Sequence, residues 1–145
     1  MEDVDKELKS AHHLLYVSLK YTKTCDVIIN LAHRWQQLIS VSIDKMLEKA
    51  KKRRLIKSVP MTPVEKINIT RLLFKKEIVI QKTLDLYEFF RKMGKLEQIR
   101  EHEFRKGVAL QVIDGEHVIR IDLEMLKNWN ILIEDFIKFV RHFIG

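Results

Sequence analysis

The sequence predicts a mainly α-helical fold, a helical bundle of about four long helices with one β-hairpin just before the last helix. Three observations lead to this prediction. Turn-forming residues are scarce, with four glycines and two prolines in 145 residues. Hydrophobic residues recur at helical spacing through most of the chain. One stretch, at about residues 108–121, instead alternates between hydrophobic and polar residues around an Asp-Gly pair, as a hairpin does.

The first third of the chain is expected to form two helices. No glycine or proline interrupts the stretch from Asp3 to Arg54, which is too long for one typical helix. We place the joint at Tyr21 to Thr24, because threonine favours helix caps and Asp26 would then lie in a new first turn. The second helix, with hydrophobic residues from Ile28 to Ala50, has the clearest i, i+3, i+4, i+7 pattern in the protein.

A third helix has a strong start signal. Thr62 is the expected N-cap, Pro63 occupies the first helical position, and Glu65 completes a capping box. The helical pattern continues to Gly94, with an irregularity near residues 75–77.

Between this helix and the last one, the periodicity changes. The stretch from Lys95 to Arg105 mixes charged and hydrophobic residues and predicts a short helix. The hairpin follows, with Asp114 and Gly115 as its two-residue turn. Its apolar face should rest on the helices, because an isolated hairpin is only marginally stable in water. Folding about this turn pairs Val112 with His117, Leu110 with Ile119, and Val108 with Ile121.

Length and composition indicate one domain that spans residues 1–145. Cys25 is the only cysteine, so no intramolecular disulfide can form, and we expect neither a metal site nor a cofactor. The acidic first residues do not fit a signal peptide, and no apolar run reaches the length of a membrane span. We therefore expect a cytoplasmic protein without a membrane partner.

The positive charge predicts an acidic partner. Lys and Arg number 27 against 20 Asp and Glu, which gives a formal net charge of +7. Nucleic acid or an acidic protein is the expected class of partner. The densest basic cluster lies at the end of the second helix and in the linker after it, and consists of Lys45, Lys49, Lys51, Lys52, Arg53, Arg54 and Lys57.

Two interpretations of this basic cluster stay open. Cations at a helix C-terminus stabilise the helix and keep the surface solvated. Adjacent cations can also displace condensed counterions together, which makes the cluster a candidate nucleic-acid-binding surface. Aromatic residues that could stack on bases are not interleaved with it, so such binding would depend little on base sequence.

The last helix runs from Leu123 to Ile144 after the cap residue Asp122, and it carries two apolar stripes. One stripe is a heptad seam with a single polar residue, Asn130, and the other is aromatic. Both stripes fit a bundle core, but they also predict a homo-oligomer, at least a dimer, in which Asn130 pairs with its own copy. The candidate interface residues are Leu126, Trp129, Asn130, Ile133, Phe136, Ile137 and Val140.

No group of residues matches a metal or catalytic motif. The best available general acid or base is His102, because Arg100 and Arg105 could hold a phosphate beside it. In size, charge and helix pattern the chain resembles the HEPN-type ribonucleases, which are small basic helical proteins. Their arginine-to-histidine motif is absent, since no arginine lies four to six residues before a histidine.

The sequence therefore favours a non-enzymatic binding or regulatory module that self-associates and takes nucleic acid or an acidic protein as its partner. Two alternatives stay open. One is a nucleic-acid-processing enzyme, a HEPN-like helical ribonuclease without the usual motif. The other is a structural subunit of a larger complex, with the apolar last helix as its docking surface.

Overall fold

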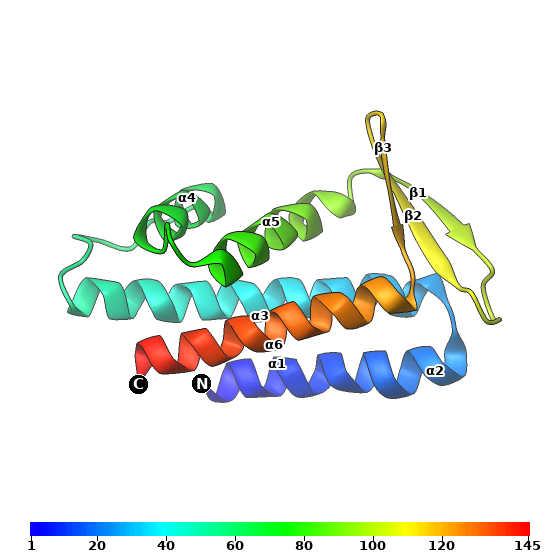
Figure 1. The fold of residues 1–145 in the computed structure, drawn as a ribbon, viewed down its shortest axis with the longest axis horizontal. Coiled ribbons are helices and arrows are strands. Elements are labelled where there is room, and N and C mark those ends of the chain that lie inside the picture. The colour runs from blue at the N-terminus through cyan, green and yellow to red at the C-terminus, as the bar shows by residue number, and fades with distance from the viewer.

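The structure is a computed structural model that describes all of residues 1–145. Its elements in chain order are α1 (Glu2–His13), η1 (Leu14–Ser18), α2 (Leu19–Thr22), α3 (Cys25–Lys52), α4 (Pro63–Leu73), α5 (Ile78–Met93), β1 (Glu97–Glu101), β2 (Ala109–Asp114), β3 (His117–Ile121) and α6 (Leu123–Ile144). The first helical segment, α3 and α6 lie lengthwise beside one another, and the sheet stands at one end of them (Figure 1). The predicted fold class, a mainly helical chain with a small β element before the last helix, is confirmed.

The predicted joint between the first two helices is confirmed. α1, the π-helical turn η1 and α2 follow one another without a break, so they form one long helical segment. This segment ends at Lys23, whose φ of 48° lies in the left-handed region. α3 then begins because the Thr24 hydroxyl oxygen accepts a hydrogen bond from the Val27 amide over 3.4 Å.

The third predicted helix is two helices, α4 and α5. α4 begins as predicted, with the Thr62 hydroxyl oxygen accepting a hydrogen bond from the Glu65 amide at 3.3 Å. The irregularity expected near residues 75–77 is a complete break, because α4 stops at Leu73 and α5 starts only at Ile78.

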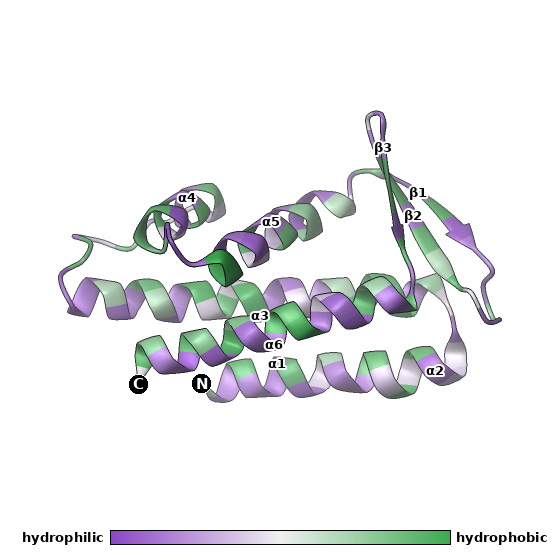
Figure 2. Ribbon diagram, in the orientation of Figure 1, coloured by the Kyte–Doolittle hydropathy of each residue, from purple (hydrophilic) through white to green (hydrophobic).

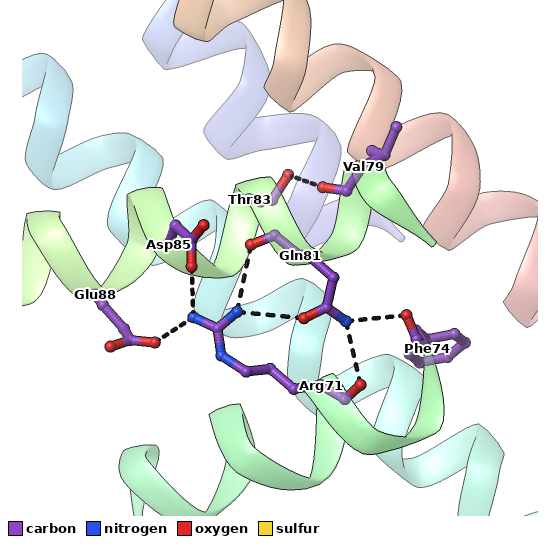
Figure 3. A network of polar contacts seen from close by, with 7 residues as sticks. All are labelled: Arg71, Phe74, Val79, Gln81, Thr83, Asp85 and Glu88. Carbon is purple, nitrogen blue, oxygen red and sulfur yellow. Dashed lines mark hydrogen bonds and ion pairs between the residues drawn. The ribbon is translucent and has the colours of Figure 1, made fainter. Parts of the chain in front are cut away.

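Arg71 and Gln81 join the two helices across this break (Figure 3). The Gln81 side-chain amide donates hydrogen bonds to the backbone carbonyl oxygens of Arg71 (3.1 Å) and Phe74 (2.9 Å). Carbonyl groups at a helix C-terminus lack partners within the helix, so Gln81 acts as a cap for α4 from outside it. The Arg71 guanidinium in turn binds the carboxylates of Asp85, at 2.8 Å, and Glu88 on α5.

The prediction of a short helix from Lys95 to Arg105 is wrong. Residues 97–101 form β1, an edge strand that pairs antiparallel with β2, with Glu97 opposite Ile113 and Glu101 opposite Ala109. A strand of this kind depends on a partner elsewhere in the chain. The local periodicity of the segment therefore did not reveal it.

The hairpin of β2 and β3 is confirmed, but its predicted register is wrong by two residues. The loop consists of Gly115 and Glu116, and not of Asp114 and Gly115. Gly115 has a φ of 63° while Glu116 is outside the left-handed region, which fits a type II′ turn with glycine first. A shift of two residues keeps the same side chains on the inner face. The observed pairs are Asp114 with His117, Val112 with Ile119, and Leu110 with Ile121.

One apolar core of 31 buried residues connects the helices and the inner face of the sheet. At its centre Trp35 of α3 is completely buried, with its ring centroid 6.2 Å from that of Phe90 on α5 and 6.4 Å from that of Trp129 on α6. Each long helix carries both hydrophobic and hydrophilic residues, as amphipathic helices of a bundle do (Figure 2). None of the helices combines the length and the apolar character that crossing a membrane requires.

Candidate polyanion-binding surface

The predicted nucleic-acid-binding residues lie at the C-terminal end of α3 and in the turn after it, at the end of the molecule away from the sheet (Figure 1). We call this set the basic end. Its members are Lys45, Lys49, Lys51, Lys52, Arg53, Arg54 and Lys57. The chain turns tightly here, because the Arg53 amide donates a hydrogen bond to the Lys49 carbonyl oxygen and the Arg54 amide donates one to the Lys51 carbonyl oxygen. Each donor–acceptor distance is 3.0 Å.

No member of the basic end forms a salt bridge in the folded chain. Lys45 and Lys49 are half-buried, and the other members are exposed. Glu48 is the only carboxylate among them in the sequence. The positive potential of these cations is therefore not cancelled by partners of their own chain.

An aromatic contact connects the basic end to the turn between α4 and α5. The Arg53 guanidinium lies over the Phe143 ring, 4.8 Å from its centroid. Phe143 packs edge-to-face against Phe74, with ring centroids 5.0 Å apart. The exposed residues Lys75 and Lys76 follow Phe74 directly. Two further exposed lysines therefore follow directly after a ring that packs on Phe143.

An open hollow of about 510 Å³ lies within the basic end. Its lining combines three cations with two aliphatic side chains: Lys51, Arg54, Leu55, Ile56 and Lys57. Arg54 has a φ of 61°, a left-handed conformation that is uncommon for a residue with a side chain. The three lining cations could form charge-assisted hydrogen bonds to a phosphate group in the hollow.

The predicted general acid or base, His102, lies exposed in the loop between β1 and β2. Arg100, one of its expected helpers, is already bound by Asp26 at 2.7 Å and Glu103 at 3.4 Å. The hydrogen bond to Asp26 raises the pKa of Arg100 above its usual value. Arg105 is exposed and forms no ion pair. Of the two arginines expected beside His102, only Arg105 is therefore free to bind a phosphate.

The predicted interface residues of α6 are packed inside their own chain. Trp129 is half-buried and the other members, listed above from Leu126 to Val140, are buried. They therefore present no open apolar face to a second copy, because neighbouring helices of the same chain already cover them. Self-association stays a prediction, but the spare apolar surface from which it was inferred is absent.

A polar group that the sequence did not reveal joins the first helical segment to α6. The Nε2 atom of His12 lies 2.8 Å from the Glu134 carboxylate, which also accepts a hydrogen bond from the Asn130 amide at 3.1 Å. His12 and Glu134 are 122 residues apart, so no local spacing could reveal the pair. Elsewhere too, no group of three or more His, Cys, Asp or Glu residues is arranged to hold a metal ion.

The comparisons with family models, with curated proteins and with solved structures found no match to this chain.

Proposed function

We propose that this protein is a nucleic-acid-binding module whose basic end contacts the phosphate backbone. One observation carries the proposal: the cations of the basic end are concentrated in one place and form no ion pair with the rest of the chain. When concentrated, unpaired cations bind a polyanion, the polyanion releases several of its condensed counterions together. This release supplies most of the affinity in non-specific binding.

The residues of the hollow suit backbone contact better than base recognition. Arg54 has a planar guanidinium that can bind a phosphate through two parallel hydrogen bonds, and Lys51 and Lys57 add point charges beside it. The aromatic ring that contacts the basic end, that of Phe143, already has Arg53 over one face. We therefore expect affinity that depends strongly on salt and little on base sequence.

The test measures binding of the parent protein to a mixed-sequence DNA duplex by fluorescence anisotropy across a salt series. In the test variant, Lys52→Glu is combined with Lys57→Glu, and Arg53 is left in place because it packs on Phe143. Each lost phosphate contact flattens the plot of log affinity against log salt by about 0.9, so the double variant should lose about two units of slope. The loss should be similar for duplexes of different sequence.

A matched control separates the basic end from net charge. Lys82→Glu combined with Lys95→Glu changes the charge by the same amount at two exposed lysines that form no ion pair. This control should keep most of the parent's affinity. If both double variants lose equal affinity, or if the parent binds no duplex at low salt, the basic end is not a nucleic-acid site. Tighter binding of polyglutamate than of duplex at equal salt would instead assign an acidic protein partner.

A further inference from the structure

A second cationic surface lies at the other end of α3. It surrounds a pocket of about 880 Å³ formed by η1, α2, the loop before β2, the end of β3 and the first two turns of α6. Part of the lining is apolar, with Leu15, Leu19, Val108 and Leu123. A volume of this size holds a small organic group such as a base with its sugar. The 28 residues of α3 separate this pocket from the basic end by about 40 Å.

The charge of this pocket is positive. Arg120 is neutralised by Glu101 at 2.9 Å and Asp122 at 3.1 Å, and Asp122 also caps α6. Glu124 is the one lining carboxylate that forms no ion pair. The remaining charged residues of the lining are four lysines without an ion pair: Lys20, Lys23, Lys106 and Lys127.

The exposed aromatic residues of the chain gather around the same pocket. Tyr16, Tyr21 and Phe104 are 50%, 77% and 77% exposed, and every other Trp, Tyr and Phe is buried or half-buried. Tyr16 lines the pocket. The ammonium of the lining residue Lys20 lies over one side of the Tyr21 ring, 5.8 Å from its centroid, and leaves that ring largely exposed. The Phe104 amide donates a hydrogen bond to the carbonyl of the lining residue Lys23 at 2.8 Å. Exposing aromatic rings to water is unfavourable, so their concentration at one cationic pocket indicates a ligand that covers them.

The backbone around the pocket supports the same conclusion. Lys23, His102 and Phe104 are three of the four non-glycine residues with a positive φ. Such conformations are costly and cluster at ligand sites. The π-helical turn η1, which carries Tyr16, is a second feature that occurs mostly at functional sites.

We propose that this pocket and its aromatic rim bind single-stranded nucleic acid by stacking unpaired bases on Tyr16, Tyr21 and Phe104 while the lysines contact the backbone. A positively charged groove with exposed aromatic rings is the arrangement by which proteins bind single strands, because every base has a face that can stack. Bases inside a duplex are stacked on one another and cannot use the rings. The proposal rests on the proposed nucleic-acid-binding function and adds the class of strand to it.

The test compares a labelled single strand of about 12 nucleotides with a duplex of the same sequence. Tyr21→Ala combined with Phe104→Ala should weaken single-strand binding about tenfold or more, because a stacked base contributes about 1–3 kcal/mol. Duplex binding at the basic end should stay at the parent's level. The ring-preserving pair Tyr21→Phe and Phe104→Tyr should restore single-strand binding. Leu72→Ala combined with Ile78→Ala, which truncates two exposed aliphatic side chains elsewhere, should have no effect.

The possible outcomes separate the two proposals. If the Tyr21→Ala, Phe104→Ala variant binds single strands as tightly as the parent, or loses single-strand and duplex affinity equally, the stacking surface is refuted while the basic end is untouched. If Lys52→Glu, Lys57→Glu has no effect on duplex binding, the basic end fails and the stacking surface is judged on single strands alone. The remaining arm of the test measures binding of the parent and the alanine variant to vesicles of phosphatidylserine and phosphatidylcholine. Vesicle binding that this alanine variant abolishes, without any change in single-strand binding, would overturn the proposal in favour of a membrane surface.

Discussion

The side-chain amide of Asn130 donates a hydrogen bond to the hydroxyl oxygen of Tyr16, 3.4 Å away. The contact joins the middle of α6 to the π-helical turn η1, across 114 positions of the sequence. It gives the one polar residue in the apolar seam a partner within its own chain. The Oδ1 oxygen of Asn130 is buried and has no hydrogen-bond partner, so part of this side chain still costs folding free energy.

We expect Asn130→Leu to leave the oligomeric state of the protein as it is in the parent. Its side-chain amide already donates to Tyr16 and Glu134 of the same chain, so the amide needs no second copy as a partner. The free energy of unfolding should change by less than about 2 kcal/mol, because the loss of an unpaired buried acceptor offsets the strain of a larger side chain. Sedimentation equilibrium at tens of micromolar compares the two proteins. A new oligomer in the variant alone would show that Asn130 does set an interface.

Gln81→Ala should lower the free energy of unfolding by about 1–2 kcal/mol, because it removes one donor from each of two carbonyl oxygens near the end of α4, and only one of them keeps another donor, the Glu77 amide. Those oxygens belong to Arg71 and Phe74. Urea denaturation followed by circular dichroism measures the change. Gln37→Ala, at an exposed glutamine of α3, is the control and should change stability by less than about 0.5 kcal/mol. Equal effects of the two substitutions would show that the hydrogen bonds of Gln81 do not contribute to the free energy of unfolding.

Cys25 should be inert toward thiol reagents in the native protein. Its thiol is buried and donates a hydrogen bond to the Ala109 carbonyl oxygen over 3.2 Å. Burial raises the pKa of Cys25 above its usual value, which lowers the fraction of reactive thiolate. Labelling with dithionitrobenzoate near pH 8 should be slow in buffer and immediate in urea. Complete native labelling within the mixing time would contradict the packing of α3 against β2.

Glu101→Gln should destabilise the protein near neutral pH and have little effect in acid. Hydrogen bonds from Gln111 and then Arg120 lower the pKa of Glu101 in the folded chain. A carboxylate with a lowered folded pKa stabilises the fold above its unfolded pKa, and this contribution disappears as the pH falls through the folded value. Thermal unfolding from about pH 7 to pH 3 should therefore show the parent and variant converging.

Glu116→Gln, at the exposed tip of the hairpin, is the control for this pH series. The unfolding temperature of this control should follow that of the parent at every pH, because Glu116 forms no salt bridge. If the unfolding temperatures of the parent and Glu101→Gln differ by the same amount down to the lowest pH, the interactions of Glu101 do not depend on its charge.

The sequence by itself determined where α3, α4 and α6 begin and which face each of the longest helices buries. Thr62 and Asp122 cap their helices as expected, and Thr24 caps α3 within the predicted joint, because an N-cap contacts an amide only three positions along the chain. The basic end could be predicted for the same reason, since its members are neighbours in the sequence and on one helix end. Such features depend on local spacing, which a sequence displays directly.

Only the tertiary structure decided which residues meet across the chain. The strand β1 exists because β2 pairs with it, and the stripes of α6 are covered because other helices of the same chain lie against them. The aromatic and lysine residues of the second pocket come from η1, α2, the loop before β2 and α6. Their meeting depends on contacts between distant segments, whose free energy comes from burying the shared core and not from any local pattern.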